Sequence, residues 1–430
     1  MENLTERDHR VIWHPYTQHK NKLPPIPITR GKGSLLFDDK DNAYIDAISS
    51  WWVNIHGHAH PYIAKKIYEQ AEKLEHVIFT GFTHEPAVRL AERLLPLLPG
   101  NFSKVFYSDN GSTAVEVAIK MVIQFWRNQG QTDAPSSRSK ILAFRHSYHG
   151  DTFGAMSVSE RSVFTAAFGD YLFDVVFIDT PTPDNIDSLL TLLHQEGSNI
   201  AGFIYEPLLQ AAGGMLLYDP SMMDRLLQAV RSHQILCIAD EVLTGFGRTG
   251  RLFAGEYLQQ QADIICLSKG LTGGTMALGV TAATERIFEA FLSDDRHKTL
   301  FHGHSFTANP IACAASLASL DLLEQGDTMT RIGIITERHR QFADRLRDIP
   351  LLKNIRTLGT IIAFEVNTGE DSYINNIGAA ITEASLRQGI YLRPLGNTVY
   401  LMPPYCITDE ELDRLYTFLL DYIKKVLVRP

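Results

Sequence analysis

The chain contains few cysteines, and none of them lies close to another. Cys237, Cys266, Cys313 and Cys406 are isolated along 430 residues and sit mostly in apolar stretches. This spacing is typical of reduced thiols in a cytoplasmic protein and argues against a disulfide framework or a cysteine-based metal site. We therefore expect a cytoplasmic protein without disulfide bonds.

Clusters of basic residues and long apolar runs are also absent. Forty Lys and Arg against 49 Asp and Glu give a formal net charge of −9, which argues against nucleic acid and anionic membranes as partners. No stretch approaches the roughly 20 apolar residues that span a bilayer. The N-terminal sequence MENLTERDHR has no signal-peptide core. We expect small molecules as partners, with neither nucleic acid nor membrane among them.

The pattern of apolar segments predicts two domains, which is common for a chain of this length. Between residues 61 and 320 apolar strands alternate with helical segments, which predicts an α/β domain with a large, mostly parallel sheet. Residues 1–60 hold a small antiparallel meander, and residues 321–430 mix helices with short strands. We expect these two ends to form one smaller α+β domain. The strands predicted for the large sheet are 105–108, 141–144, 174–178, 201–206, 235–240 and 263–268.

Two of these strands end in polar residues of complementary charge. The run 235–239 leads into Asp240, and the run 263–267 leads into Ser268 and Lys269. Both runs are apolar on both faces, as buried strands of a parallel sheet are. Because ligand groups project from the carboxyl ends of such strands, we expect Asp240 and Lys269 at one edge of the sheet. More often, such a pair forms a structural salt bridge between strand ends.

A carboxylate and an amine at one sheet edge also suit pyridoxal phosphate. The lysine amine can form a Schiff base with the aldehyde of this cofactor. The carboxylate can keep the pyridine nitrogen protonated, so that the ring accepts electrons. The pair therefore predicts this cofactor if the remaining parts of its site occur elsewhere in the chain.

A phosphate site is one such part. The segment 109–113, with Gly111 and Ser112, follows a strand and precedes a helix that is apolar almost all round. Backbone N–H groups at a helix N-terminus bind phosphate, and glycine permits close approach. Thr113 and Glu116 have the spacing of a capping box, so an ordinary capped helix is the simpler alternative.

Several aromatic and cationic residues could shape a pocket. Tyr148 follows the strand 141–144 and could stack on a flat ring, although simple packing is the commoner role. Arg393 carries a guanidinium fork that suits a substrate carboxylate, and a structural ion pair is an equal alternative. The adjacent Trp51 and Trp52 could line an aromatic pocket, with core packing as the default.

A loop and two groups of histidines complete the candidates. The loop 302–307 offers hydroxyl and amide groups for a second phosphate contact. No carboxylate or cysteine lies at a matching spacing to the histidines, so we predict no metal site. The histidines in question are His302 and His304 in this loop, and His56, His58 and His60 near the N-terminus.

Together these motifs resemble the class III aminotransferases of the fold-type I pyridoxal-phosphate family over essentially the whole chain. Several of the shared stretches are long and specific. The resemblance implies a fold-type I pyridoxal-phosphate-dependent transferase of the α/β class, with a large mostly parallel sheet domain and a smaller α+β domain. The matching stretches are WHPYT, SSWWVNIHGHAHP, SDNGSTAVEVAIK, YHGDTFGAMSV, ADEVLTGFGRTG, LSKGLTGG and RPLGNTVYLMPPY.

The resemblance implies a role for each matching residue. Lys269 would be the lysine that binds the cofactor aldehyde, and Asp240 would be the partner of the pyridine nitrogen. The phosphate would be held by Gly111 and Ser112, and Tyr148 would cover the ring. The substrate pocket would be shaped by Tyr16, Trp51, Tyr148, Gly303, Arg393 and Tyr400.

The resemblance also implies a homodimer with shared active sites. His304 and Ser305 would reach the cofactor phosphate of the neighbouring subunit. Relatives usually read Pro-Thr at these two positions, so the chain departs from the pattern here. Serine keeps the hydroxyl group, and the phosphate contact is therefore expected to survive.

The motifs are most similar to those of family members that pass the amino group of S-adenosylmethionine to 8-amino-7-oxononanoate in biotin biosynthesis. Members that use 2-oxoglutarate commonly carry EPIQGEGG, whose second glutamate gates an arginine. Residues 206–214 read EPLLQAAGG instead, which disfavours that reaction. A broad ω-amine or lysine-using transaminase and a catalytically silent aminotransferase-like binding protein remain as alternatives.

Overall fold

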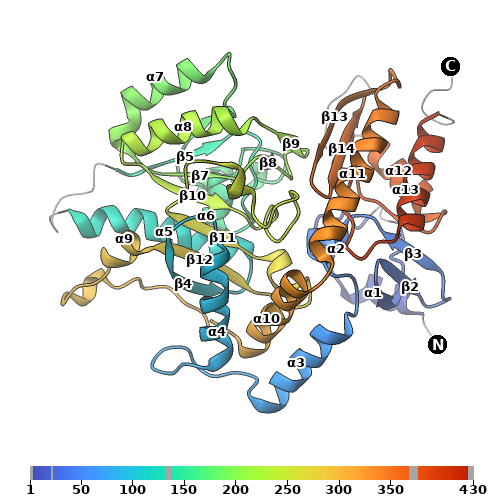
Figure 1. Ribbon diagram of the computed structural model, residues 1–430, viewed down its shortest axis with the longest axis horizontal. Coiled ribbons are helices and arrows are strands. Elements are labelled where there is room, and N and C mark those ends of the chain that lie inside the picture. Colours follow the sequence, from blue (N-terminus) through green and yellow to red (C-terminus); the bar gives the residue numbers. More distant parts are fainter. Residues whose placement is uncertain (1–2, 21–22, 131–137, 368–375, 425–430) are drawn as a thin grey trace.

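The computed structural model describes residues 3–20, 23–130, 138–367 and 376–424, and a seven-stranded sheet dominates it (Figure 1). The strand order is β4-β12-β11-β10-β7-β5-β6. Only β12 runs in the direction opposite to the other six strands, so the predicted mostly parallel sheet is confirmed. The strands are β4 (Phe102–Ser108), β5 (Lys140–Phe144), β6 (Val175–Ile178), β7 (Ile200–Tyr205), β10 (Leu236–Asp240), β11 (Ile264–Leu267) and β12 (Gly279–Thr284).

Helices cover both faces of this sheet. Along β10, Leu236 and Ile238 pack in one core cluster with α5, whereas Cys237 and Ala239 pack in another with α4, α7, α8 and α10. Burial on both faces explains why the central strands read as continuous apolar runs. The helices around the sheet are α3 (Pro61–Lys73), α4 (Glu85–Leu94), α5 (Gly111–Gln129), α6 (Phe153–Val158), α7 (Ile186–Glu196), α8 (Pro220–Ser232), α9 (Glu285–Glu289) and α10 (Pro310–Gln325).

The two ends of the chain share a second, smaller unit. The strand β15 pairs in parallel with β3, so that a C-terminal strand completes the N-terminal meander in a four-stranded sheet, β1-β2-β3-β15. Figure 1 shows the blue and the orange-red segments side by side. The division of the chain at residues 60 and 320 stays a prediction. This sheet contains β1 (Ile28–Lys32), β2 (Leu35–Asp38), β3 (Ala43–Asp46) and β15 (Ile390–Tyr391).

A three-stranded sheet, β13-β14-β16, lies in the same unit. Its core joins residues from both chain ends, for example Ile45, Ile362 and Leu415. Short elements elsewhere are α1 (Leu4–Val11), α2 (Ser49–Trp52), β8 (Leu209–Gln210) and β9 (Leu216–Leu217). The remaining elements of the unit are β13 (Leu352–Leu358), β14 (Ile361–Val366), β16 (Thr398–Leu401), α11 (Thr328–Leu346), α12 (Asn376–Leu386) and α13 (Asp409–Tyr422).

The start of α5 differs from the prediction. Asn110 is the N-cap: its side chain accepts from the Thr113 backbone N–H at 2.9 Å, and the Thr113 hydroxyl accepts from the Asn110 N–H at 3.1 Å. The predicted Thr113–Glu116 capping box is therefore wrong, because the helix begins earlier and asparagine is as good a cap as threonine. Glu116 instead accepts the backbone N–H groups of Gly154 and Ala155 at the start of α6.

The cysteines carry free thiols, as predicted. Cys237, Cys266 and Cys313 are buried, and Cys406 is exposed. Within the described ranges, no helix combines the length and the apolar character that crossing a bilayer requires.

Candidate active site

A cavity of about 790 Å³ lies at the carboxyl ends of β10 and β11. Its volume falls within the range of roughly 300–1,000 Å³ that is usual for small-molecule sites. In the ladder, Asp240 pairs with Cys266, so Lys269 follows at the same edge of the sheet. Both side chains line the cavity, and the structure thus brings together the pair that the sequence singled out.

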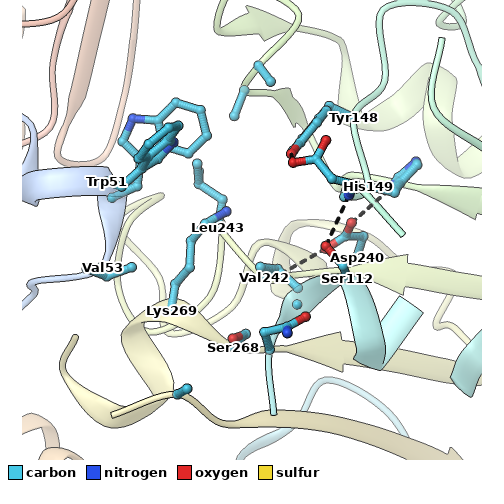
Figure 2. A pocket seen from close by; sticks show the side chains of 18 of the residues that line it. Trp51, Val53, Ser112, Tyr148, His149, Asp240, Val242, Leu243, Ser268 and Lys269 are labelled. Atoms are coloured by element: carbon cyan, nitrogen blue, oxygen red, sulfur yellow. Dashed lines mark hydrogen bonds and ion pairs between the residues drawn. The ribbon is translucent and has the colours of Figure 1, made fainter. Parts of the chain in front are cut away.

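Two hydrogen bonds fix the Asp240 carboxylate. Its Oδ2 lies 2.7 Å from His149 Nδ1, and its Oδ1 accepts the backbone N–H of Val242 at 3.0 Å (Figure 2). Because a carboxylate only accepts, Nδ1 of His149 carries the ring hydrogen. His149 was not predicted as a site residue. It stands next to Tyr148 in the sequence, but no local pattern links it to a position 91 residues away.

Lys269 reaches into the cavity from η5 (Lys269–Thr272), as Figure 2 shows. Its amine has no hydrogen-bond acceptor among the described residues, and Nζ lies 5.1 Å from the centroid of the Trp52 ring. Desolvation lowers the pKa of Lys269, while the charges of Asp240 and Glu206 act in the opposite direction. A lowered pKa leaves more of the amine neutral, which is the form that attacks a carbonyl group.

Glu206 is a second buried carboxyl group in the cavity, and its role was not predicted. Its two oxygens accept the backbone N–H groups of Tyr148 at 3.1 Å and Ala211 at 3.0 Å. Burial raises the pKa of Glu206 to about 7, with His149 opposing this shift and Asp240 adding to it. Near neutral pH the group is therefore protonated part of the time, which limits the negative charge beside Asp240.

The N-terminus of α5 forms one end of the cavity. A Cβ atom at Gly111 would lie 2.7 Å from Val242 Cγ1, and one at Gly150 would lie 2.1 Å from Ser112 Oγ, so both positions need glycine for close packing. Ser112 also lines the cavity. The first N–H groups of a helix lack intrahelical partners and carry partial positive charge, so this end suits a phosphate group.

Hydrogen-bonded tyrosines border the cavity. Tyr148 donates from its hydroxyl group to Asp151 Oδ2 at 2.9 Å, and the Tyr16 hydroxyl donates to the same oxygen. The two hydroxyl oxygens are 3.3 Å apart. This contact ties the N-terminal segment to the large-sheet part of the molecule. Asp151, which joins the two tyrosines, belongs to the stretch YHGDTFGAMSV, and no role was predicted for it.

The remaining wall is aromatic and cationic. Trp51 packs against Tyr16 with 5.4 Å between ring centroids, and the Arg393 guanidinium lies 4.6 Å above the Trp51 ring. Trp52 donates its indole N–H to the Tyr400 hydroxyl at 2.8 Å. A pocket next to the main cavity is therefore lined by five of the six residues predicted for the substrate: Tyr16, Trp51, Tyr148, Arg393 and Tyr400.

The sixth, Gly303, lies elsewhere together with His304 and Ser305. Gly303 and Ser305 are exposed, His304 is half-buried, and none of the three lines the cavity of the described chain. Their loop runs beside α5, where Lys120 Nζ contacts the Phe301 carbonyl oxygen at 3.3 Å. Within one chain they cannot contribute to the site that holds Lys269.

Two of the histidines considered for a metal site, His56 and His58, have protein partners. His56 Nε2 lies 3.0 Å from Ser319 Oγ, and His58 Nε2 lies 2.8 Å from Asp46 Oδ2. Across the described segments, no group of three or more His, Cys, Asp or Glu residues is arranged to hold a metal ion.

Comparison with known proteins agrees with this geometry. The model of the aminotransferase class-III family matches residues 16–424. The chain belongs to this family, whose members are pyridoxal-phosphate-dependent transaminases.

Individual relatives point to a subgroup of this family. The adenosylmethionine-8-amino-7-oxononanoate aminotransferase of Synechococcus elongatus is 44% identical, over 97% of this chain and 99% of the relative. The protein of the same name from Geobacter sulfurreducens is 37% identical, over 99% and 97% of the two chains.

Solved structures give the same fold. The crystal structure of the same-named enzyme from Methanocaldococcus jannaschii superposes with a TM-score of 0.92 at 33% identity and covers 98% of both chains. An omega transaminase from Pseudomonas jessenii in complex with PMP gives 0.91 at 26% identity and covers 99% of both chains. The fold-type I architecture is thereby confirmed.

The lowered pKa of Lys269 predicts its reactivity. With a pKa below that of an exposed lysine, its amine becomes neutral at a lower pH. In cofactor-free protein, reductive methylation between about pH 6 and pH 10 should therefore reach its half-maximal rate at a lower pH for Lys269 than for Lys66 of α3, whose pKa is raised by its hydrogen bond to Glu69. Peptide mass spectrometry measures both rates in one sample, and an equal pH dependence would contradict the assignment.

Proposed function

We propose that the protein transfers the amino group of S-adenosylmethionine to 8-amino-7-oxononanoate, with pyridoxal phosphate as the cofactor. The observation that carries the proposal is the placement of Asp240 and Lys269 at the floor of one cavity. The names of the relatives supply the substrates. The proposal gives 7,8-diaminononanoate as the product, for biotin biosynthesis.

The residues present fit the cofactor. The α5 N-terminus with Gly111 and Ser112 suits the phosphate, and the fixed Asp240 carboxylate suits a protonated ring nitrogen. Pyridoxal phosphate supplies an aldehyde that takes up an amino group and a ring that accepts electrons. With the cofactor bound, Asp240 would hold the proton on the ring nitrogen, and His149 keeps this carboxylate in place. Tyr148, which also lines the cavity, would be the aromatic residue against the ring.

Lys269 moves the proton in this mechanism. With the cofactor bound, its amine would take the proton from the substrate carbon that bears the amino group and would then donate it on the cofactor side. An amine can accept a proton only when it is neutral, so the lowered pKa of Lys269 favours this step. The charges of Asp240 and Glu206 would stabilise the ammonium group that forms, since they act to raise the pKa of Lys269.

The adjoining pocket accounts for the acceptor. Arg393 binds the distal carboxylate through its guanidinium fork, and Trp51 and Tyr148 contact the apolar chain of the acceptor. Tyr16 closes the pocket from the N-terminal segment. The Tyr400 hydroxyl accepts the hydrogen bond of the Trp52 indole and thereby orients the Trp52 ring in the pocket wall. Donor and acceptor occupy the same pocket in turn, so a comparison of donors, rather than the shape of the pocket, identifies the donor.

A broad ω-amine or lysine-using transaminase is the second candidate, because the omega transaminase of Pseudomonas jessenii shares the fold at a TM-score of 0.91. The fold therefore does not separate the two activities. A catalytically silent binding protein is disfavoured because Lys269 and Asp240 are both in place at the cavity.

A donor comparison tests the function. With the cofactor bound, S-adenosylmethionine should bleach the absorbance of the cofactor faster than lysine or alanine does, and the acceptor should restore it. Lys269→Ala protein should show no bleaching. Faster reaction with lysine or alanine would favour the second candidate. If the protein bound no chromophore after reconstitution with pyridoxal phosphate, the result would favour the catalytically silent binding protein.

We also propose a homodimer in which His304, Ser305 and Gly303 serve the site of the neighbouring subunit. Their loop lies on the surface and outside the cavity of its own chain. The α5 N-terminus already occupies one side of the phosphate position, and a second chain can supply the other side without threading a loop through the sheet.

Hybrid dimers test the shared site. Ser305→Ala alone should weaken cofactor binding about tenfold, the effect of losing one hydrogen bond to a charged group. In a hybrid of a Ser305→Ala chain and a Lys269→Ala chain, one site collects both lesions and the other collects neither. Recovery of one normal site per hybrid, measured by activity and cofactor titration, is the expected result. Hybrids without a normal site would show that Ser305 serves its own subunit.

We propose the cytoplasm as the site of action. The four thiols are free, as is usual for proteins in a reducing compartment. The substrates in the proposal are small metabolites, and the chain's charge does not favour nucleic acid.

A further inference from the structure

The turn that carries the two cavity tryptophans has an unusual backbone. Ser49, Ser50 and Trp52 have φ angles of 54°, 59° and 68°. This left-handed region is uncommon for residues other than glycine. The segment Ser49–Trp52 also departs from helical geometry at Trp51, with φ −118° and ψ 55°. Strained backbone of this kind persists only where surrounding groups hold it, and it tends to occur at functional sites.

Asp46, the last residue of β3, holds this turn from within. Its side chain is fully buried. Oδ1 accepts the Ile48 backbone N–H at 3.3 Å, and Oδ2 accepts the Ser50 hydroxyl at 3.0 Å. The same Oδ2 lies 2.8 Å from His58 Nε2. One carboxylate thus joins three points of the chain around the strained turn.

His58 fixes that carboxylate in turn. Asn54 Nδ2 lies 3.0 Å from His58 Nδ1, and because an amide NH₂ only donates, Nδ1 accepts. The ring hydrogen is therefore on Nε2 and points to Asp46. Gly31 packs closely against His58, since a Cβ at Gly31 would lie 2.5 Å from the His58 Cβ.

The turn places an aromatic ring on each side of the reacting region. Trp52 lies under the amine of Lys269, with 5.1 Å from Nζ to the ring centroid. Trp51 lies 4.6 Å from the guanidinium of Arg393. A change in the turn would therefore displace both the ring next to the lysine and the ring that supports Arg393.

From this geometry we propose that Asp46 and His58 are positioning residues, which set the location of Trp51 and Trp52 and thereby the fit of the acceptor. Neither residue lines the cavity, so neither touches substrate or cofactor. The consequence for the acceptor rests on the function proposed above. The placement of the rings does not depend on that function and can be measured separately.

The ring positions can be followed by ¹⁹F NMR of the full-length, cofactor-loaded protein labelled with 5-fluorotryptophan. The chain has four tryptophans, and Trp51→Phe and Trp52→Phe assign the two signals of interest. Asp46→Asn should move these two signals and leave those of Trp13 and Trp126 in place. The reason is that an amide cannot accept from all three donors of the carboxylate at once.

The chain offers a matched control in Asp38, at the end of β2 in the same sheet. Asp38 is also buried, and its carboxylate also organises a turn, accepting from Lys40 N, Asn42 N and Asn42 Nδ2. This turn joins β2 to the start of β3, where Phe37 pairs with Ala43, whereas the tryptophans follow Asp46 at the opposite end of β3. Asp38→Asn should leave both tryptophan signals and the kinetics unchanged, even if it lowers the melting temperature as much as Asp46→Asn does.

The kinetic test separates positioning from stability. Asp46→Asn should lower kcat/KM for 8-amino-7-oxononanoate by about tenfold or more, as a misplaced contact does, mainly through KM. Titration with pyridoxal phosphate should remain near the wild-type value. His58→Leu should act like Asp46→Asn, whereas His58→Gln, which keeps an N–H donor, should recover part of the loss.

Two results would overturn the proposal. One is unchanged Trp51 and Trp52 signals in folded Asp46→Asn and His58→Leu proteins. The other is a kinetic loss that Asp38→Asn reproduces at equal loss of stability. A wild-type protein that fails to transaminate would refute the proposed function, while the ¹⁹F signals would still decide whether Asp46 and His58 hold the rings.

Discussion

The parallel register of β10 and β11 is the constraint on which the site depends. Asp240 pairs with Cys266 in this ladder, which leaves Lys269 just beyond the end of the neighbouring strand. A shift of one residue would turn either side chain to the other face of the sheet. Helices pack on both faces, so the apolar residues of both strands have fixed positions and the register has no freedom to slip.

The second wall of the cavity depends on contacts between the two ends of the chain. β3 and β15 pair in parallel, which brings the turn after β3 next to the segment that carries Arg393. The Ser49 hydroxyl donates to the Met402 carbonyl oxygen at 2.8 Å, and Trp52 donates to Tyr400. The large sheet thus supplies the proposed chemical groups, and the small unit supplies most of the pocket proposed for the acceptor.

The sequence was sufficient where a local pattern determines the structure. The apolar runs before Asp240 and Lys269 marked two central strands, which the structure contains as β10 and β11. The strand β12 escaped prediction because GVTAAT consists of small residues without a strong strand pattern.

Other features could not be seen because no local pattern encodes them. His149 contacts Asp240 only in the folded sheet. The positive φ angles at Ser49 and Ser50 occur at residues other than glycine, so the sequence does not indicate them. Ser305 is a different case. Its role in a neighbouring subunit is an inference from resemblance, and a single chain places it on the surface.

The proposed mechanism depends on Asp240 facing the ring nitrogen of the cofactor. Its most direct test is the ¹⁵N chemical shift of ring-labelled pyridoxal phosphate bound to the wild-type protein and to Asp240→Asn. The account predicts a protonated ring nitrogen in the wild-type protein and loss of that proton in the variant, because an amide offers no negative charge to retain it. The same protonated shift in both proteins would contradict the account.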